Sequence, residues 1–207
     1  MGIRLIGIDV DGTLLDSAGR LSDANPDGIH EAVAAGIHVA LVTGRSYPFA
    51  RPVAEPLPAG ITLIVSNGAV ERAMDGHVLA RRLLDRTVAR DVLGCTRPYR
   101  EAAGLVFDRE QAGQIVFENM DWNHPGRKRY WMRNQHLIAR AVPLEDALVE
   151  DPIQVMFNGG VGPMRALAGA LRAEATGFAV SLTQYQHRDF SLIDITAPGG
   201  TKGRALA

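Results

Sequence analysis

Two aspartates stand one residue apart directly after an apolar run, in the stretch IDVDGT. Asp9 and Asp11 end this run, and Gly12 follows them. A carboxylate can attack phosphorus when a cation offsets its charge, while a second carboxylate can serve as acid or base. The pair indicates phosphoryl-transfer or metal chemistry, although the same spacing also occurs in metal-binding glycosyltransferases and in ordinary turns.

Residues that suit the same chemistry follow three other segments of the chain. Thr43, Gly44 and Arg45 follow a second apolar run, Asn67 follows a third, and Lys202 stands in the stretch GGTKG. Ligands of a parallel α/β sheet bind beyond the carboxyl ends of its strands, so we expect these side chains to meet there. The ammonium of Lys202 would offset the charge that a carboxylate and a phosphate bring together.

The apolar runs themselves show little alternation, which is typical of parallel strands covered on both faces. They span residues 3–10, 37–42 and 61–65. Between the first two runs, we expect Asn25 to cap a helix that ends near Gly36. Such a strand, helix and strand unit predicts an α/β fold with a parallel sheet.

The sequence pattern changes after the third run. Asp75-Gly76 predicts a hairpin, and a helical stretch near residues 85–103, broken near Pro98, precedes a series of short strands and a further helix. These features predict a second, inserted α+β domain. We expect the following division: a discontinuous core of residues 1–80 and 188–207, and an insert of residues 81–187.

Bulk composition narrows the classes of partner and compartment. The formal net charge of −1 gives no reason to expect a nucleic acid, and no apolar run is long enough to span a membrane. Cys95 is the only cysteine, so an internal disulfide is impossible and we expect a cytoplasmic protein. We interpret the basic stretch at 124–133, HPGRKRYWMR, as an exposed helix face or a domain surface and not as a nucleic-acid site.

Four motifs in this order, DVDGTLLDS, LVTGRS, SNGA and TKGRAL, resemble the haloacid dehalogenase (HAD) superfamily, and within it the Cof-like sugar-phosphate phosphatases. The resemblance covers nearly the whole chain. It implies a HAD-like Rossmannoid core, with three α/β/α layers around a parallel sheet. It also implies that the inserted domain is a cap that closes over the site, excludes water and selects the substrate.

The resemblance implies a Mg²⁺-dependent phosphatase that acts on a small phosphorylated metabolite, such as a sugar phosphate, through an aspartyl-phosphate. It also implies a role for each motif residue. These roles are as follows: Asp9 as nucleophile, Asp11 as acid and base, Asp9 and Asp11 as metal ligands, Thr43 and the Gly44 amide as phosphate contacts, Lys202 as the neutralising cation, and Gly12, Arg45 and Asn67 as further residues of the substrate site.

One departure from the family pattern leaves alternatives open. Family members continue beyond the lysine helix to an acidic GD-x-x-ND motif that completes the metal site, whereas this sequence stops at Ala207. We therefore expect a truncated chain that is weakly active or inactive as printed. A sugar phosphomutase of the same superfamily, or a catalytically inactive protein that binds ligands or partners, remains an alternative.

Overall fold

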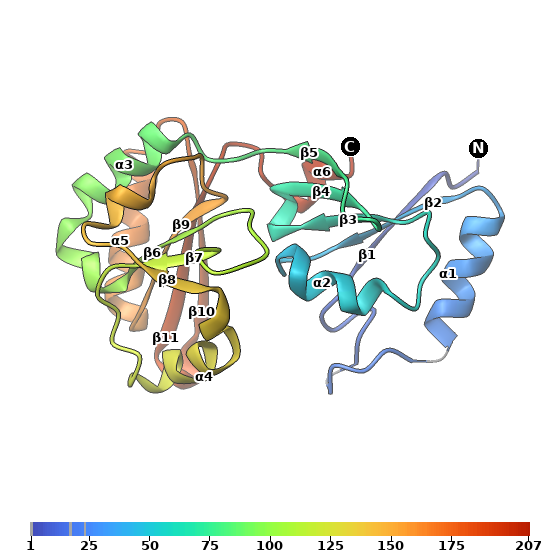
Figure 1. Ribbon diagram of the computed structural model, residues 1–207, viewed down its shortest axis with the longest axis horizontal. Helices are drawn as coiled ribbons and strands as arrows, with labels where there is room; N and C mark the ends of the chain where they lie inside the picture. The colour runs from blue at the N-terminus through green and yellow to red at the C-terminus, as the bar shows by residue number, and fades with distance from the viewer. Residues whose placement is uncertain (1, 17, 23) are drawn as a thin grey trace. The chain divides into compact units, whose positions relative to one another are not determined.

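A computed structural model describes residues 2–16, 18–22 and 24–207 of the chain, which divides into two compact units (Figure 1). The first unit is formed by Met1–Arg82 and Gly199–Ala207, and the second by Leu83–Pro198. The second unit is therefore an insertion in the chain of the first. Within the described part of the chain, no helix is both long and apolar enough to cross a lipid bilayer.

The first unit contains a five-stranded sheet in the order β1-β2-β3-β4-β5. β1, β2 and β3 pair in parallel, while β4 and β5 extend the sheet as an antiparallel hairpin. The elements of this unit are β1 (Leu5–Asp9), α1 (Ala24–Ala34), β2 (His38–Val42), α2 (Tyr47–Ala54), β3 (Thr62–Val65), η1 (Ser66–Gly68), β4 (Val70–Ala73), β5 (Val78–Arg81) and α6 (Lys202–Ala205).

The two faces of this first sheet are covered by different elements. Ile6 and Ile8 of β1 line a small pocket together with Ile29 of α1. Gly7 lies between them on the opposite face, where a β-carbon would come within 2.8 Å of the Leu206 side chain. Alternate residues of a strand point to opposite faces, so this single strand links α1 to the segment that carries Lys202.

The second unit contains a six-stranded sheet in the order β10-β11-β9-β6-β7-β8, in which all pairs except β7–β8 are antiparallel. Its elements are α3 (Arg86–Cys95), η2 (Arg97–Ala102), β6 (Ala103–Val106), β7 (Ile115–Phe117), α4 (Pro125–Asn134), η3 (Gln135–Leu137), β8 (Ile138–Arg140), η4 (Leu144–Ala147), β9 (Gln154–Gly159), α5 (Val161–Ala173), β10 (Ala179–Tyr185), η5 (Gln186–Arg188) and β11 (Phe190–Thr196).

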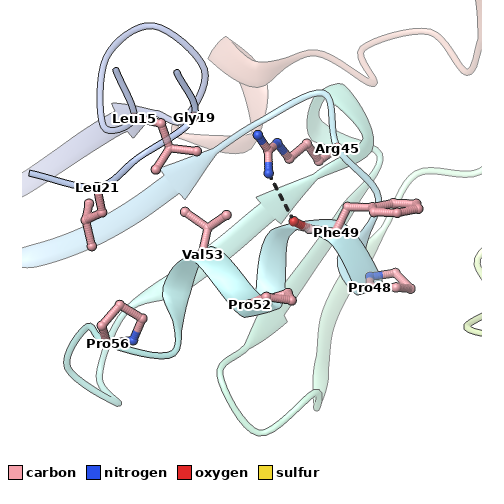
Figure 2. A pocket seen from close by; sticks show the side chains of 9 residues that line it. All are labelled: Leu15, Gly19, Leu21, Arg45, Pro48, Phe49, Pro52, Val53 and Pro56. Atoms are coloured by element: carbon pink, nitrogen blue, oxygen red, sulfur yellow. Dashed lines mark hydrogen bonds between the residues drawn. The ribbon is translucent and has the colours of Figure 1, made fainter. Parts of the chain in front are cut away.

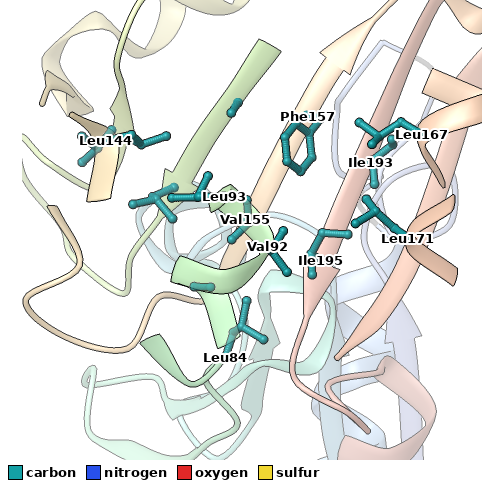
Figure 3. Packing of buried hydrophobic residues seen from close by; sticks show 14 of the residues in the cluster. Leu84, Val92, Leu93, Leu144, Val155, Phe157, Leu167, Leu171, Ile193 and Ile195 are labelled. Atoms are coloured by element: carbon teal, nitrogen blue, oxygen red, sulfur yellow. The ribbon is translucent and has the colours of Figure 1, made fainter. Parts of the chain in front are cut away.

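One face of the second sheet packs against α3 and α5 to form the core of this unit (Figure 3). Val155, Phe157 and Ile193 of the sheet meet Val92 of α3 and Leu167 of α5 in a buried cluster. Each buried aliphatic or aromatic side chain contributes roughly 1.5–3 kcal/mol of transfer free energy. The second unit therefore has a hydrophobic core of its own.

The predicted elements agree with the fold in most places. The three apolar runs are parallel strands, the hairpin turns at Asp75-Gly76, and the helix after residue 85 gives way to a 3-10 segment at Arg97. Asn25 does not cap α1: it lies inside the helix, where its side chain donates to the carbonyl oxygen of Leu14 at 2.9 Å. The Asn25 side chain therefore makes a tertiary hydrogen bond in place of the helix cap that we expected.

The boundary between the units differs from the expected one at its second crossing. The sequence pattern placed residues 188–198 in the core, but these residues include β11, which pairs with β9 and β10. The insert therefore covers 83–198 rather than 81–187. The pattern was misleading because a strand with buried alternate positions looks the same in either sheet.

Candidate active site

The carboxylate of Asp9 lies at the end of β1, where it forms an ion pair with Lys202. The Nζ atom of Lys202 donates a hydrogen bond to Oδ1 of Asp9. Both side chains are 40% exposed, so a ligand from solvent can reach the pair. The fold thus joins the first and last predicted site residues, which the sequence separates by 193 positions.

Lys202 is positioned by a close contact between two backbone segments. Gly68 has φ of +101°, and a β-carbon on it would lie 2.5 Å from the carbonyl carbon of Thr201. The Thr201 hydroxyl accepts a hydrogen bond from the amide of Arg204 at 3.3 Å, at the start of α6. A glycine is required here because any side chain would meet backbone atoms that cannot move aside.

Asp11 is bound to Arg45 rather than to Lys202. Arg45 donates from Nη2 to Oδ1 of Asp11 at 2.6 Å and from Nε to Oδ2 at 3.1 Å. This two-bond geometry is the strong form of the arginine–carboxylate interaction. It holds the pKa of Asp11 below its ordinary value, with smaller contributions from the positive charges of Arg45 and Lys202 and an opposing effect of burial.

The end of β2 and the end of β3 are tied together by backbone hydrogen bonds. The Asn67 amide donates to the Thr43 carbonyl at 3.0 Å, and the Ser66 amide donates to the Arg45 carbonyl at 2.8 Å. Ser66 and Asn67 both adopt positive φ angles, of 51° and 59°. Non-glycine residues rarely adopt this conformation, which costs of order 1–3 kcal/mol and is common at functional sites.

Thr43, Gly44 and Asn67 are neighbours at this edge of the sheet. Thr43 is 1% exposed, and its hydroxyl accepts from the Arg45 amide at 3.1 Å. A β-carbon on Gly44 would lie 2.9 Å from Oδ1 of Asn67, so the side chain of Asn67 lies next to Gly44. Asp9 pairs in register with Val42, the residue before Thr43, so the ends of β1 and β2 are adjacent.

The sequence-predicted residues thus gather at the carboxyl ends of β1, β2 and β3. Gly12 follows β1 with φ of +82°, and no atom of the described residues lies within 4 Å of its β-carbon position. The pairing of Arg45 with Asp11 was not expected from the sequence, which predicted only that Arg45 belongs to the substrate site. No local signal could have found it, since 34 positions separate the two residues.

A divalent cation has few protein ligands at this site. In the described ranges, no group of three or more histidine, cysteine, aspartate or glutamate side chains could hold a metal. The candidate donors implied by the family resemblance belong to Asp9 and Asp11, whose side chains are bonded to Lys202 and Arg45. These are oxygen donors, and Mg²⁺ binds through one or two carboxylates while keeping several waters, so the residues present fit a loosely held Mg²⁺.

A largely apolar pocket of about 420 Å³ borders Arg45 (Figure 2). It is lined by α2 residues such as Phe49 and Val53, and by Leu15 and Leu21 of the segment after β1. Arg45 also donates from Nη1 to the Phe49 carbonyl at 3.4 Å, which Figure 2 marks. Asp9 and Lys202 are not part of this lining, so the pocket is distinct from the ion pair at the strand ends.

The chain belongs to the haloacid dehalogenase-like hydrolases, since the sequence profile of that family matches residues 6–207. It is 39% identical over 82 residues to 5-amino-6-(5-phospho-D-ribitylamino)uracil phosphatase YcsE of Bacillus subtilis, a match that spans 40% of this chain and 33% of YcsE. It is 35% identical over 91 residues to phosphatase YwpJ of the same organism, spanning 44% of this chain and 32% of YwpJ. The matched segments therefore amount to about a third of these relatives.

Solved structures give the same fold. The crystal structure of TM0651 from Thermotoga maritima has a TM-score of 0.76 to this chain at 17% identity, and the match covers 99% of this chain and 73% of that protein. These findings confirm the resemblance to HAD hydrolases and the α/β fold class.

Proposed function

We propose that the protein is a Mg²⁺-dependent phosphatase that hydrolyses a small phosphorylated metabolite through an aspartyl-phosphate on Asp9. The observation that carries the proposal is the ion pair between Asp9 and Lys202 at the carboxyl end of the sheet. Membership of a hydrolase family supports the reaction class. Two curated relatives are themselves named as phosphatases.

In the first half of the reaction, an oxygen of Asp9 attacks phosphorus and the bond to the leaving oxygen breaks. Lys202 offsets the negative charge that the carboxylate and the phosphoryl group bring together, and the Thr43 hydroxyl and Gly44 amide are suited to hold phosphoryl oxygens. Asp11 gives its proton to the leaving oxygen. Since Arg45 stabilises ionised Asp11, we infer that Arg45 turns away before Asp11 can carry that proton.

In the second half, a water molecule attacks the aspartyl-phosphate and releases inorganic phosphate. Asp11, now ionised, accepts the proton of that water, and the Asp9 carboxylate is regenerated. Mg²⁺ bound by the Asp9 carboxylate and the Asp11 carbonyl would lower the repulsion between the reacting anions. A hydrolase transfers the phosphoryl group to water, whereas a phosphomutase transfers it to a second hydroxyl group of the substrate.

We further propose that the substrate is a phosphorylated sugar or polyol. The name of the relative YcsE describes a substrate with a phosphorylated ribityl chain, and its matched segment is more than a third identical to this chain. The inserted unit of residues 83–198 would act as a cap that selects the substrate.

The proposal is tested by replacing the nucleophile. We expect the wild-type protein to release phosphate slowly from p-nitrophenyl phosphate with added Mg²⁺, and D9N to lose that activity by at least about 10³-fold while keeping its circular dichroism spectrum. D27N is a matched control, because Asp27 lies in the first turn of α1. Retention of activity in D9N would refute the nucleophile assignment, and substrate conversion without phosphate release would favour a mutase.

A further inference from the structure

The pocket beside Arg45 is a largely apolar cavity of the first unit. It has a volume of about 420 Å³, and all of its lining residues belong to that unit. Among these described residues, Arg45 is the only one with a polar side chain, and the others are leucine, valine, phenylalanine, proline and glycine. Pockets of this size with an apolar lining and few polar groups are typical of small-molecule sites. The lining therefore restricts the kind of molecule that can bind.

One wall of the pocket is formed by α2 and the turn that follows it. Pro48, Pro52 and Pro56 stand four positions apart, and all three line the pocket. Residues at this spacing lie on one side of a helix. The proline rings carry no polar atom and fix the φ angle, so this wall loses little conformational freedom when a ligand binds. Val53 points into the space between α2 and the segment after β1 (Figure 2).

The opposite wall is a loop that is closed by its own hydrogen bonds (Figure 2). Leu15 and Leu21 form an isolated antiparallel bridge, and both line the pocket. Between them, the Asp16 carboxylate accepts hydrogen bonds from the amides of Ala18 and Arg20 at 2.8 and 2.9 Å. The Asp16 amide donates to the Arg20 carbonyl at 2.9 Å. Both walls are thus formed without a ligand, which lowers the cost of binding one.

The guanidinium of Arg45 has hydrogen-bonding capacity left for a ligand. An arginine has five N–H donors, of which Nε and Nη2 each use one on Asp11, at 3.1 and 2.6 Å. Nη1 donates to the Phe49 carbonyl at 3.4 Å, which is a long hydrogen bond. Within the described part of the chain, Nη1 and Nη2 each keep a second N–H. Two such groups along one edge of a guanidinium match the two oxygens of a carboxylate.

We propose that this pocket binds a small organic acid with an aromatic or aliphatic body, at a site distinct from that of the phosphorylated substrate. The body packs between the prolines of α2 and the two leucines. The carboxylate accepts hydrogen bonds from Nη1 and Nη2 of Arg45, which keeps its two bonds to Asp11. At roughly 30 Å³ for each water-sized group, the pocket holds about 14 such groups, which is the size of a phenylalkanoic or medium-chain acid.

A single negative charge fits this pocket better than a phosphate does. Asp11 already offsets part of the charge of Arg45, and Arg45 is the one cation among the described lining residues. A phosphate dianion would lose its hydration without a second cation to replace it. The phosphorylated substrate is expected beside Lys202 instead, so the two ligands do not compete for one cation.

The experiment measures the binding of phenylbutyrate and octanoate to the full chain, each beside its uncharged amide, by NMR chemical-shift titration. We expect at least one acid to bind the wild type with a Kd on the order of 1 mM or tighter, with the shifts concentrated on α2 and near Leu15 and Leu21. The matching amide should bind about threefold or more weakly, because it loses the charge-assisted hydrogen bonds.

Variants test whether the pocket holds the acid. V53W fills the pocket and should raise Kd about fivefold or more. R45K keeps the positive charge but lacks the paired N–H groups, and should weaken binding to a similar extent. V33W is the matched control, because Val33 is a half-buried valine of α1 outside the lining, and should leave Kd unchanged. Circular dichroism establishes that each variant is folded, and L21F, which fills the pocket from the other wall, replaces V53W if that variant is not.

Several results would overturn the site. These are no binding of either acid up to about 10 mM, ten times the expected Kd, equal affinity for acid and amide, and equal affinity of V53W and the wild type. Displacement of the acid by inorganic phosphate would also overturn it, since the acid would then occupy the site of Asp9 and Lys202. None of these measurements requires phosphatase activity, so a failure of the proposed function leaves the test intact.

Discussion

At the scale of single residues, the acidic side chains of interest lie in two kinds of environment. Asp9 and Asp11 each have a cation, Lys202 and Arg45, at hydrogen-bond distance. Among the residues that the structure describes, the one hydrogen-bond donor to the Asp194 side chain is the amide of Gln154. A cation beside a carboxylate stabilises its ionised form, whereas a desolvated carboxylate without a cation binds a proton more tightly. The environments of Asp11, whose pKa is lowered, and Asp194, whose pKa is raised, therefore predict opposite effects of pH on stability.

For Asp194 the sign follows from its raised pKa. The folded protein binds a proton more tightly than the unfolded chain, so the free energy of unfolding falls as pH rises from about 4 to 6. Replacing Asp194 by asparagine removes this fall in the free energy of unfolding. We expect D194N to be more stable than the wild type by roughly 1–3 kcal/mol at pH 7, and equally stable near pH 4.

Urea unfolding followed by circular dichroism at both pH values measures this difference. The exposed variant E174Q serves as the control and should match the wild type at each pH. A D194N protein that is less stable than the wild type at pH 7 would contradict the account of Asp194 as an uncompensated acid. The outcome does not depend on catalytic activity.

At the scale of elements, the site depends on where short segments touch. η1 follows β3 and lies against the backbone of Thr201, one residue before α6. The contact exists because Gly68 has no side chain and adopts a positive φ angle. A four-residue helix has little stability of its own, so this contact positions Lys202 more than the helix does.

G68A should therefore destabilise the first unit and displace Lys202. We expect a loss of roughly 1–3 kcal/mol in the free energy of unfolding, together with a loss of any phosphatase activity. G28A is the matched control, since Gly28 lies inside α1 with nothing within 4 Å of its β-carbon position. Alanine there should be neutral or stabilise by up to about 1 kcal/mol.

In the second unit, an ion pair joins η2 to η4. Arg100 donates to the Glu145 carboxylate from Nη1 at 2.9 Å and from Nη2 at 2.5 Å, and both side chains are less than a fifth exposed. The hydrogen bond from Arg100 lowers the pKa of Glu145 below its ordinary value of 4.5. The pair therefore stabilises the folded state above pH 4.5, and its contribution falls as Glu145 is protonated at lower pH.

E145Q should lose roughly 1–3 kcal/mol of unfolding free energy at pH 7, because Arg100 remains largely buried with fewer acceptors. The difference from the wild type should shrink as the pH is lowered through the pKa of Glu145. Urea unfolding at pH 7 and at pH 4 measures both values. A loss that is constant with pH would assign the effect to packing rather than to charge.

At the scale of the whole molecule, the chain forms two hydrophobic cores. Leu63 is fully buried in the first unit, and Phe157 is fully buried in the second. In the described ranges, the strands of each sheet pair within one unit, and each unit has its own apolar cluster. Separate cores allow separate unfolding transitions, because cooperativity requires shared packing.

We expect two thermal transitions in calorimetry. F157A should lower the midpoint of one transition, and L63A should lower the other, since each substitution creates a cavity worth roughly 2–5 kcal/mol in a different core. The two variants act as controls for one another. A single transition that both variants shift equally would contradict the division into independently packed units.

Much of the fold follows from local patterns. The apolar runs that end at Val10, Val42 and Val65 predicted the parallel strands, because burial on both faces leaves no polar alternation. The Asp75-Gly76 turn is equally local, since Gly76 adopts a positive φ angle that few other residues tolerate. The second boundary of the insert could not be predicted, because strand order is a long-range property.

The sequence by itself determined which residues stand at the strand ends, since a strand that must be buried stops where polar residues begin. Those residues are Asp9, Asp11, Thr43, Gly44 and Asn67. Only the tertiary structure decided that Lys202 pairs with Asp9, that Arg45 pairs with Asp11, and that Asp194 is desolvated with no cation beside it among the described residues. The reason is physical: side-chain type and spacing are local properties, whereas desolvation and charge pairing depend on which distant segments the packed sheets bring together.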